Sequence, residues 1–204
     1  CNVTGTGFES YDECFFGCDA TLGVCNTPPN DTCDAPIALT SGVTVSGNID
    51  VYNNDHDIDS SSDFCSSIST SGADAVYSIT ANDGDIITAS VDATFDTVLW
   101  VSSGCDVAQP SLTGCLGADN KTSSSGEFVQ FVVPAAGTYL VTVAARSSTS
   151  TGTFDLTVTT EQPDCTPGQP NVCDAVGTSV EFCNGLGLLE TFACGGNGVC
   201  ANGA

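Results

Sequence analysis

The sequence has very few basic side chains. Lys121 and Arg146 are its only lysine and arginine, against 25 aspartates and glutamates, so the formal net charge of the 204 residues is −23. Because proteins hold nucleic acid and anionic lipid with clusters of basic residues, this composition excludes both classes of partner. It also argues against chemistry on phosphates, which only backbone amides or a bound metal could hold here.

Long apolar runs and methionine are missing as well. No run approaches the ~18 apolar residues of a membrane-spanning helix, so we expect no transmembrane segment. Methionine is absent even from position 1, and we expect the chain to begin after a removed signal sequence or to lie within a longer precursor. Hydrophobic residues make up 41% of the chain, which is typical of a folded protein rather than a disordered one.

What the sequence does have is thirteen cysteines. No two of them are separated by just two residues, the spacing of zinc knuckles and thioredoxin-like centres, so disulfides are favoured over bound metal. This density is typical of a secreted or cell-surface protein. Because thirteen is odd, one thiol is left over. The open explanations are a free buried thiol, a disulfide to a neighbouring molecule, and a lipid on Cys1.

Cysteine spacing and prolines divide the chain into three parts, residues 1–29, 30–161 and 162–204. The outer parts are too short to fold around a core of their own, so cross-links must substitute for one. The first part ends at Thr27-Pro28-Pro29-Asn30, where two prolines stiffen the connection. The half-cystines expected in the outer parts are Cys1, Cys14, Cys18, Cys25, Cys165, Cys173, Cys183, Cys194 and Cys200.

The middle part has the pattern of β-strands. Apolar and polar residues alternate in Thr138–Val143 and in Phe154–Thr159, with many β-branched and aromatic side chains. Clusters of Gly, Ser, Asn and Asp separate such runs, as turns do. At least seven short strands without a helical pattern predict an all-β, antiparallel sandwich with Trp100 in its core. The other predicted strands are Val43–Ile49, Ala75–Ala81, Asp85–Val91, Thr94–Ser102 and Glu127–Val133.

The two ends of the chain carry related cysteine modules. In each, Cys-Asn precedes a short run with a central glutamate, followed by another cysteine. Repetition of a unit is typical of tandem arrays and fibres, although small disulfide modules also converge on similar spacings. The matching residues are Cys1-Asn2, Phe8-Glu9-Ser10-Tyr11 and Cys14 at one end, and Cys183-Asn184, Leu189-Glu190-Thr191-Phe192 and Cys194 at the other.

Five stretches of the middle part carry a family resemblance. They are Asn30-Asp31-Thr32-Cys33, Gly72–Thr80, Phe95–Val101, Ala136–Val143 and Gly152–Val158. In this order they resemble bacterial pre-peptidase C-terminal domains, in the cysteine-containing form found on surface proteins. The flanking modules resemble linker repeats of bacterial cell-surface proteins.

The resemblance implies a jelly-roll-like β-sandwich that is a non-catalytic appendage of a secreted enzyme or a unit of a cell-surface protein. Some members of the family bind calcium or insoluble polymers such as collagen. The resemblance also implies the disulfides Cys33–Cys65 and Cys105–Cys115, each of which would stabilise the fold by ~3–4 kcal/mol.

One acidic loop has the spacing of calcium ligands. Its carboxylates match positions one, three, five and nine of a calcium loop, and hard oxygens suit that ion. Ser60 stands in place of the expected glycine and Ser66 in place of the bidentate glutamate, so the loop is no EF-hand. It is either a calcium site or a solvated acidic loop. The four candidate ligands are Asp55, Asp57, Asp59 and Asp63, and a vaguer second group is Asp83, Asp85, Asp92 and Asp96.

No pattern for catalysis is evident. His56 is the only imidazole and lies among aspartates, and there is no Gly-x-Ser-x-Gly elbow. Phe95-Asp96-Thr97 is followed by valine rather than the glycine of an aspartic protease motif. Paired carboxylates for glycoside hydrolysis would depend on a separation in space that the sequence does not give. We therefore expect a protein that is not an enzyme.

Together these features predict a non-catalytic, extracellular structural protein on a cell surface. It would be the repeating unit of a fibre or adhesive array, with copies of itself as partners through disulfides and β-strand contacts. The alternative is an accessory module that binds carbohydrate or collagen and delivers a secreted hydrolase to it. Calcium is the one cofactor that the sequence suggests.

Overall fold

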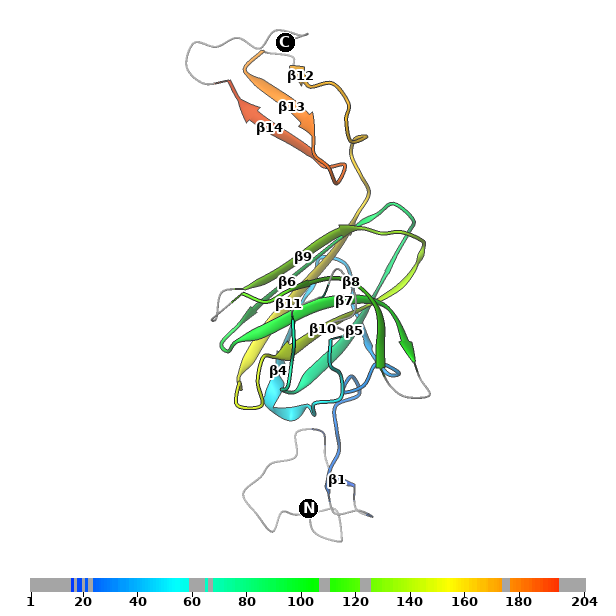
Figure 1. The fold of residues 1–204 in the computed structure, drawn as a ribbon, viewed down its shortest axis with the longest axis vertical. Helices are drawn as coiled ribbons and strands as arrows, with labels where there is room; N and C mark the ends of the chain where they lie inside the picture. The colour runs from blue at the N-terminus through cyan, green and yellow to red at the C-terminus, as the bar shows by residue number, and fades with distance from the viewer. Residues whose placement is uncertain are drawn as a thin grey trace.

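The regular structure is built almost entirely of strands. The computed structural model describes residues 16, 18–19, 21, 24–58, 65, 68–106, 111–121, 126–173 and 177–194. Two sheets stack as layers in the middle of the molecule, and a smaller sheet lies beyond them at each end (Figure 1). The short 3-10 helix η1 (Ile49–Val51) is the one helix among the described residues. The predicted all-β sandwich is confirmed.

The two layers have five and four strands. Their orders are β3-β5-β10-β7-β8 and β4-β11-β6-β9, so strands that are consecutive in sequence repeatedly change layer. All pairs are antiparallel except β3 with β5, which is parallel. The strands of the larger sheet are β3 (Ile37–Ala38), β5 (Asp74–Ala81), β7 (Thr97–Asp106), β8 (Ser111–Asp119) and β10 (Gly137–Ala145). Those of the smaller sheet are β4 (Thr44–Asn48), β6 (Ile86–Ala93), β9 (Glu127–Val132) and β11 (Thr153–Glu161).

The two layers differ in how they are covered. Along β11 buried and exposed residues alternate, because only one side of the four-stranded sheet meets the core. Strand β5 is buried at nearly every position, which requires cover on both faces of the five-stranded sheet. Leu99 and Val141 point into the core between the layers, and Trp100 points to the opposite face. Trp100 is 1% exposed, as a core residue should be. It belongs, however, to a second cluster of buried residues, on the outer face of the five-stranded sheet.

The segments that contain Cys33 and Cys65 cover the second cluster, and disulfides attach them to β7 and β8. We call these segments the cover. Cys33 bonds to Cys105 and Cys65 to Cys115, with Cα–Cα distances of 5.8 and 6.3 Å. The predicted pairs Cys33–Cys65 and Cys105–Cys115 are therefore wrong. The register explains why: Cys105 faces Leu112 across β7 and β8, whereas Cys115 faces Ser102. An offset of three positions separates the two cysteines by ~10 Å, beyond the reach of a disulfide.

The small sheets at the two ends are also associated with cysteines. Strands β1 (Cys18–Asp19) and β2 (Val24–Cys25) pair with Cys18 opposite Cys25. At the other end, β12 (Val172–Cys173), β13 (Ser179–Cys183) and β14 (Leu189–Ala193) form a three-stranded sheet. We call this sheet with its connections, residues 162–194, the C-terminal module. That the three parts of the chain divide at these boundaries remains a prediction.

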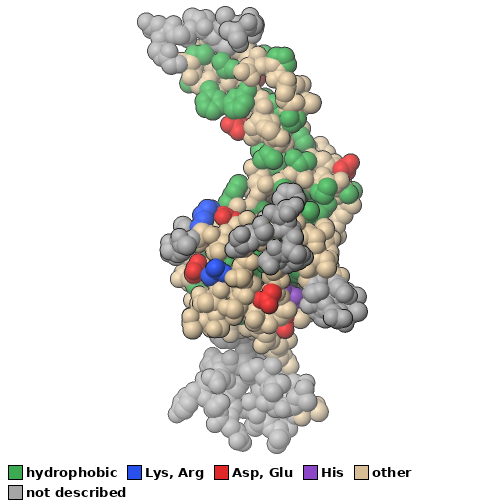
Figure 2. Space-filling view, in the orientation of Figure 1, with side chains coloured by type: hydrophobic (Ala, Val, Ile, Leu, Met, Phe, Trp, Pro, Cys, Tyr) green, Lys and Arg blue, Asp and Glu red, His purple; other side chains and the backbone are tan. Residues whose placement is uncertain are grey.

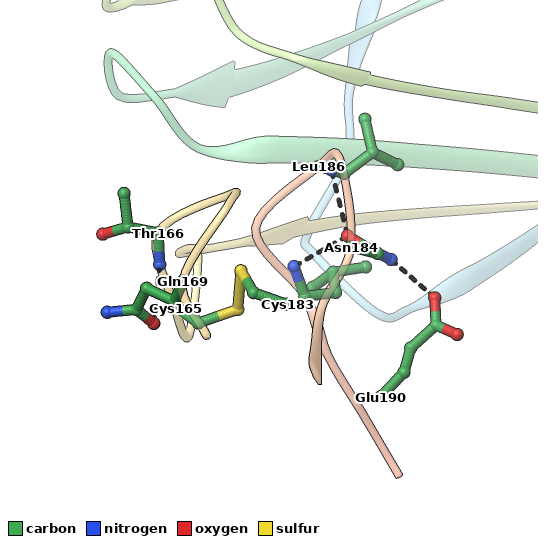
Figure 3. The surroundings of a disulfide bond; sticks show 8 residues. Cys165, Thr166, Gln169, Cys183, Asn184, Leu186 and Glu190 are labelled. Carbon is green, nitrogen blue, oxygen red and sulfur yellow. Dashed lines mark hydrogen bonds between the residues drawn. A yellow bond between two sulfur atoms is a disulfide. The ribbon is translucent and has the colours of Figure 1, made fainter. Parts of the chain in front are cut away.

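The C-terminal module is held by the Cys165–Cys183 disulfide and by Asn184 (Figure 3). The Oδ1 atom of Asn184 accepts the backbone N–H groups of Leu186 and Leu188 at 3.0 Å, and its Nδ2 donates to Glu190 at 2.7 Å. Cys173 is disulfide-bonded as well.

Cys194, predicted as a half-cystine, instead carries a free thiol, the one free cysteine in the described part of the chain. Cys1, Cys14 and Cys200 lie outside the described residues.

Candidate functional site

A group of polar side chains is buried where the chain enters the sandwich. We call Asn30, Asp31, His56 and Asp74 the buried acidic cluster; they are between 0 and 4% exposed. Burial of polar groups is costly unless they are hydrogen-bonded, so such a group needs a structural or functional reason. The segment before β3, the loop after η1 and the first residue of β5 contribute its members.

Asp74 organises the loop after η1. Its Oδ2 accepts the backbone N–H groups of Asp55 at 3.1 Å and His56 at 3.0 Å. Burial raises the pKa of Asp74 to about 8; the two backbone hydrogen bonds oppose this, and the charges of Asp55 and Asp31 add to it. At neutral pH Asp74 is therefore a neutral carboxylic acid.

Asp31 accepts two hydrogen bonds from one residue of the loop. Its Oδ1 accepts the backbone N–H of Asn53 and its Oδ2 the Nδ2 of the same residue, both at 2.7 Å. Burial raises the pKa of Asp55, and the charge of Asp31 and a hydrogen bond to it raise that pKa further.

His56 is not the polar loop residue that the sequence suggests. It is buried, and its Nε2 accepts the backbone N–H of Cys33 at 3.0 Å. A ring nitrogen that accepts a hydrogen bond carries no proton, so this contact requires the neutral imidazole at Nε2. His56 joins the loop to the disulfide-bonded segment at Cys33. Its Nε2 is therefore not free to act as a base.

The predicted calcium ligands are only partly brought together. Asp55 and Asp57 are exposed on the loop, and Asp59 and Asp63 lie outside the described residues. Within the described ranges, no three His, Cys, Asp or Glu side chains are arranged to hold a metal ion. Both oxygens of Asp31 and one of Asp74 already accept N–H groups. The carboxyl oxygens of the buried acidic cluster are therefore better suited to hold protons and to accept hydrogen bonds from peptide N–H groups than to bind a calcium ion. The calcium site remains a prediction.

Sequence reasoning missed Asp31 and Asp74 as members of a cluster. The signal was weak: a carboxyl at the head of the apolar run of β5 is the only local hint. Nothing in the sequence shows that it meets the backbone of residues 55 and 56.

A second candidate is the outer side of the four-stranded sheet, which we call the hydroxyl face. Its side chains are exposed or half-buried because no further layer covers them. Most are hydroxyls or carboxylates, and neighbouring strands bring them into rows. The members are Thr44 and Ser46 of β4, Asp155, Thr157 and Thr159 of β11, Thr88, Ser90 and Asp92 of β6, and Phe128 and Gln130 of β9.

Hydrogen bonds between strands order the hydroxyl face. The Thr44 and Thr157 hydroxyls lie 2.7 Å apart, and Ser46 donates to Asp155 at 2.5 Å. Gln130 donates to the Thr88 hydroxyl at 2.9 Å. Side chains tied in this way lose little further freedom when a ligand binds.

Three acids of the second predicted group take different places. Asp92 lies on the hydroxyl face directly opposite Asp155, next to a hollow of about 210 Å³. Asp85 is buried, and its Oδ2 accepts the backbone N–H and the Nδ2 of Asn82, so it stabilises the turn before β6. Asp83 is exposed and lines a larger, open hollow of about 510 Å³ at the base of the C-terminal module.

Glu127 is a further acid that the sequence did not single out. It points into the sandwich and is 1% exposed, with its Oε2 bonded to the Thr97 hydroxyl. Burial raises the pKa of Glu127. Its contact with Thr97 joins the starts of β9 and β7, one from each layer.

Apolar side chains gather on the C-terminal module. Figure 2 shows them over the end of the molecule that β12, β13 and β14 form. Val172, Leu189 and Phe192 are each about half exposed, and Phe192 stacks on Phe182 with ring centroids 5.0 Å apart. This sheet is too small to bury its own aromatic side chains.

Comparison with known proteins yields structural similarity only. No family model matches the chain, and no curated protein matches its sequence. Among solved structures, it is similar to the pre-peptidase C-terminal domain of a collagenase from Bacillus anthracis, with 14% identity and a TM-score of 0.41 over 60% of this chain and 93% of that one. It is also similar to PliG of Aeromonas hydrophila, a periplasmic inhibitor of g-type lysozyme, with 15% identity and a TM-score of 0.41 over 62% and 96% of the two chains.

Membrane insertion by a helix finds no support in the described ranges. They contain no helix with the length and apolar character that crossing a bilayer requires.

Proposed function

We propose that this chain is a non-catalytic structural unit of an extracellular fibre or adhesive array. The observation that carries the proposal is the placement of cysteine-containing sheets at opposite ends of the sandwich (Figure 1). A unit with a cysteine-containing element at each end is suited to head-to-tail contacts with copies of itself. Such heterologous contacts build filaments rather than closed rings when the rotation between units does not close.

Two further features support assembly. The C-terminal module exposes Leu189 and Phe192, and Phe192 is two residues from the free thiol of Cys194. Strand β14 forms the edge of its sheet, so its outer backbone groups have no strand partner within that sheet. Apolar side chains, an open edge and a thiol are the elements of a disulfide-linked strand contact.

A location outside the cytosol follows from the same chemistry. Disulfides at Cys33–Cys105, Cys65–Cys115 and Cys165–Cys183 form and persist in oxidising compartments. We also propose that residues 30–161 form a pre-peptidase C-terminal domain and that the end modules are related to repeats of cell-surface proteins. Both proposals rest on the sequence motifs.

Electron microscopy combined with gels under reducing and non-reducing conditions tests the proposal. Ordered filaments, with a ladder of covalent oligomers that reductant removes, are the expected result. The Cys194→Ser variant should lose the ladder, while the matched surface variant Ser179→Ala should keep it. Dispersed monomers under oxidising conditions would refute the proposal.

Polymer binding is the second candidate function. The uncovered, hydrogen-bonded hydroxyl face favours it, because flat polar surfaces suit extended ligands with many hydroxyls. Sedimentation with insoluble collagen, chitosan, chitin and cellulose tests it. A fibre unit that binds none of these polymers would sediment to the same extent with and without them.

A further inference from the structure

The arrangement of acids on the hydroxyl face is unfavourable without a partner. Asp92 and Asp155 face each other across β6 and β11, so their Cβ atoms are ~4.5–5.5 Å apart and their carboxylates repel each other. Both side chains are exposed. Among the described residues the one carboxylate in an ion pair with a base is Asp119, bonded to Lys121, and Arg146 bonds instead to Ser69. Lys121 also donates to the backbone carbonyl of Gly126, so neither base forms an ion pair with Asp92 or Asp155.

The surroundings of the acid pair have the elements of a sugar site. The hollow beside it, about 210 Å³ in volume, is lined by the pair together with Ala93, Thr94, Thr153 and Phe154. Ser46 holds Asp155 in place. Along the same face, Phe128 is 48% exposed beside Ser90, the residue opposite it on β6. An exposed ring can cover the apolar side of a pyranose, and carboxylates and hydroxyls can bond its polar edge.

We propose that the hydroxyl face binds a polysaccharide that carries amino groups, lying across β4, β11, β6 and β9. The ammonium of an amino sugar sits at Asp92 and Asp155, where it neutralises the pair. Phe128 contacts a neighbouring sugar ring, and Thr44, Thr157 and Ser90 bond ring hydroxyls. This rests on the second candidate function, polymer binding, and is independent of fibre assembly.

Charge complementarity selects this occupant. A neutral polysaccharide would fill the hollow but leave the repulsion between Asp92 and Asp155 in place. A second copy of the chain, with its own excess of acids, would bring like charges together at the face. A cationic chain rich in hydroxyls satisfies both the charge and the hydrogen-bonding groups.

The test is binding of a glucosamine oligosaccharide and of its N-acetylated counterpart, measured by calorimetry at mildly acidic pH. The intact protein should bind the free amine form more tightly. Asp92→Asn/Asp155→Asn should weaken that binding about tenfold and remove the preference between the two sugars, because the variant has lost both charges that the ammonium contacts. Phe128→Ala should weaken the binding of both.

The matched control is Asp83→Asn/Asp164→Asn, which makes the same change in net charge at the other hollow. It should leave binding within twofold of the intact protein. Equal weakening by both double variants would mean general attraction to an acidic protein, and weakening by the control alone would place the site at the base of the C-terminal module. Either result overturns the proposal.

Two further measurements separate the possible failures. Thermal melting should show that Asp92→Asn/Asp155→Asn is folded and at least as stable as the intact protein, because the substitutions remove a repulsion. If the intact protein bound neither the oligosaccharides nor any insoluble polymer, the polymer-binding function itself would fail. Binding to chitosan that both double variants retain would refute only the assignment to the hydroxyl face.

Discussion

Asp74 illustrates how one carboxyl can organise a loop by remaining uncharged. It stands at the head of β5, and its side chain reaches back to the backbone of Asp55 and His56. An ionised group here would be desolvated and close to two other acids. The neutral form keeps the two hydrogen bonds without adding a third negative charge.

The pH dependence of stability follows from the raised pKa of Asp74. In the folded state its pKa is about 8, against an ordinary value of 3.8. Between these values the folded protein holds a proton that the unfolded chain has lost. The free energy of unfolding should therefore fall as pH rises through this range, by up to ~1.4 kcal/mol per pH unit, and level off above pH 8.

Replacement of Asp74 by asparagine should remove this contribution. Asparagine can accept the same two N–H groups and does not titrate, so the unfolding free energy of the variant should vary less with pH between 4 and 8. Urea unfolding at several pH values measures it. The exposed control Asp83→Asn should run parallel to the intact protein, and a parallel curve for Asp74→Asn would contradict the assignment.

Among single residues, Trp100 and His56 show what sequence can and cannot predict. Trp100 was expected in a core because a lone large aromatic in a β-rich chain has few other places. His56 was expected in a polar loop because its neighbours are aspartates, yet it is buried. Its burial depends on the Cys33 backbone N–H, which is distant in sequence, so local composition carries no sign of it.

Strands were predictable where one face is polar and the other apolar, as in β11. Strand β7 was expected to start at Thr94, but pairing with β10 begins at Thr97. Strand β8 was not expected, because its glycines, serine and threonine have the composition of a turn. Strands β13 and β14 were missed for a different reason: the small C-terminal module has little core to impose an apolar pattern.

The acidic loop after η1 is the element on which calcium binding was predicted. If its carboxylates hold calcium, adding the ion should raise the melting temperature, and a chelator should lower it again. Asp57→Asn should reduce the shift, whereas Asp83→Asn should not. Melting temperatures that neither calcium nor chelator changes would rule the site out.

Disulfide pairing depends on the register between paired strands rather than on the spacing of cysteines in the sequence. Cys33→Ser/Cys105→Ser opens a bond between residues 72 apart in sequence. By the chain-entropy relation, the free energy of unfolding should fall by ~4 kcal/mol. Chemical denaturation followed by near-ultraviolet circular dichroism, which reports on the sandwich, measures the loss. Cys165→Ser/Cys183→Ser is the control, because that bond lies in the C-terminal module, and an equal loss in both variants would contradict the assignment.

At the scale of the whole molecule, the net charge of −23 is the dominant feature. Repulsion among the carboxylates opposes both folding and association at low ionic strength. The melting temperature should rise as sodium chloride increases from about 10 mM to about 0.5 M, because the Debye length falls from ~30 Å to ~4 Å. Calorimetric scans check this. A melting temperature independent of salt would show that bound cations or protons already neutralise the acids.

The cover over the outer face of the five-stranded sheet has a practical consequence. Trp100 is the only tryptophan in the chain, and it shares its cluster with Cys33, Cys65 and Cys115. Its fluorescence is therefore a single-site reporter of the two bonds that hold the cover. Under a mild reductant, its emission should shift to longer wavelength as water reaches the indole, while the far-ultraviolet signal of the strands persists. Opening of this cover could thus be followed in real time in unlabelled protein.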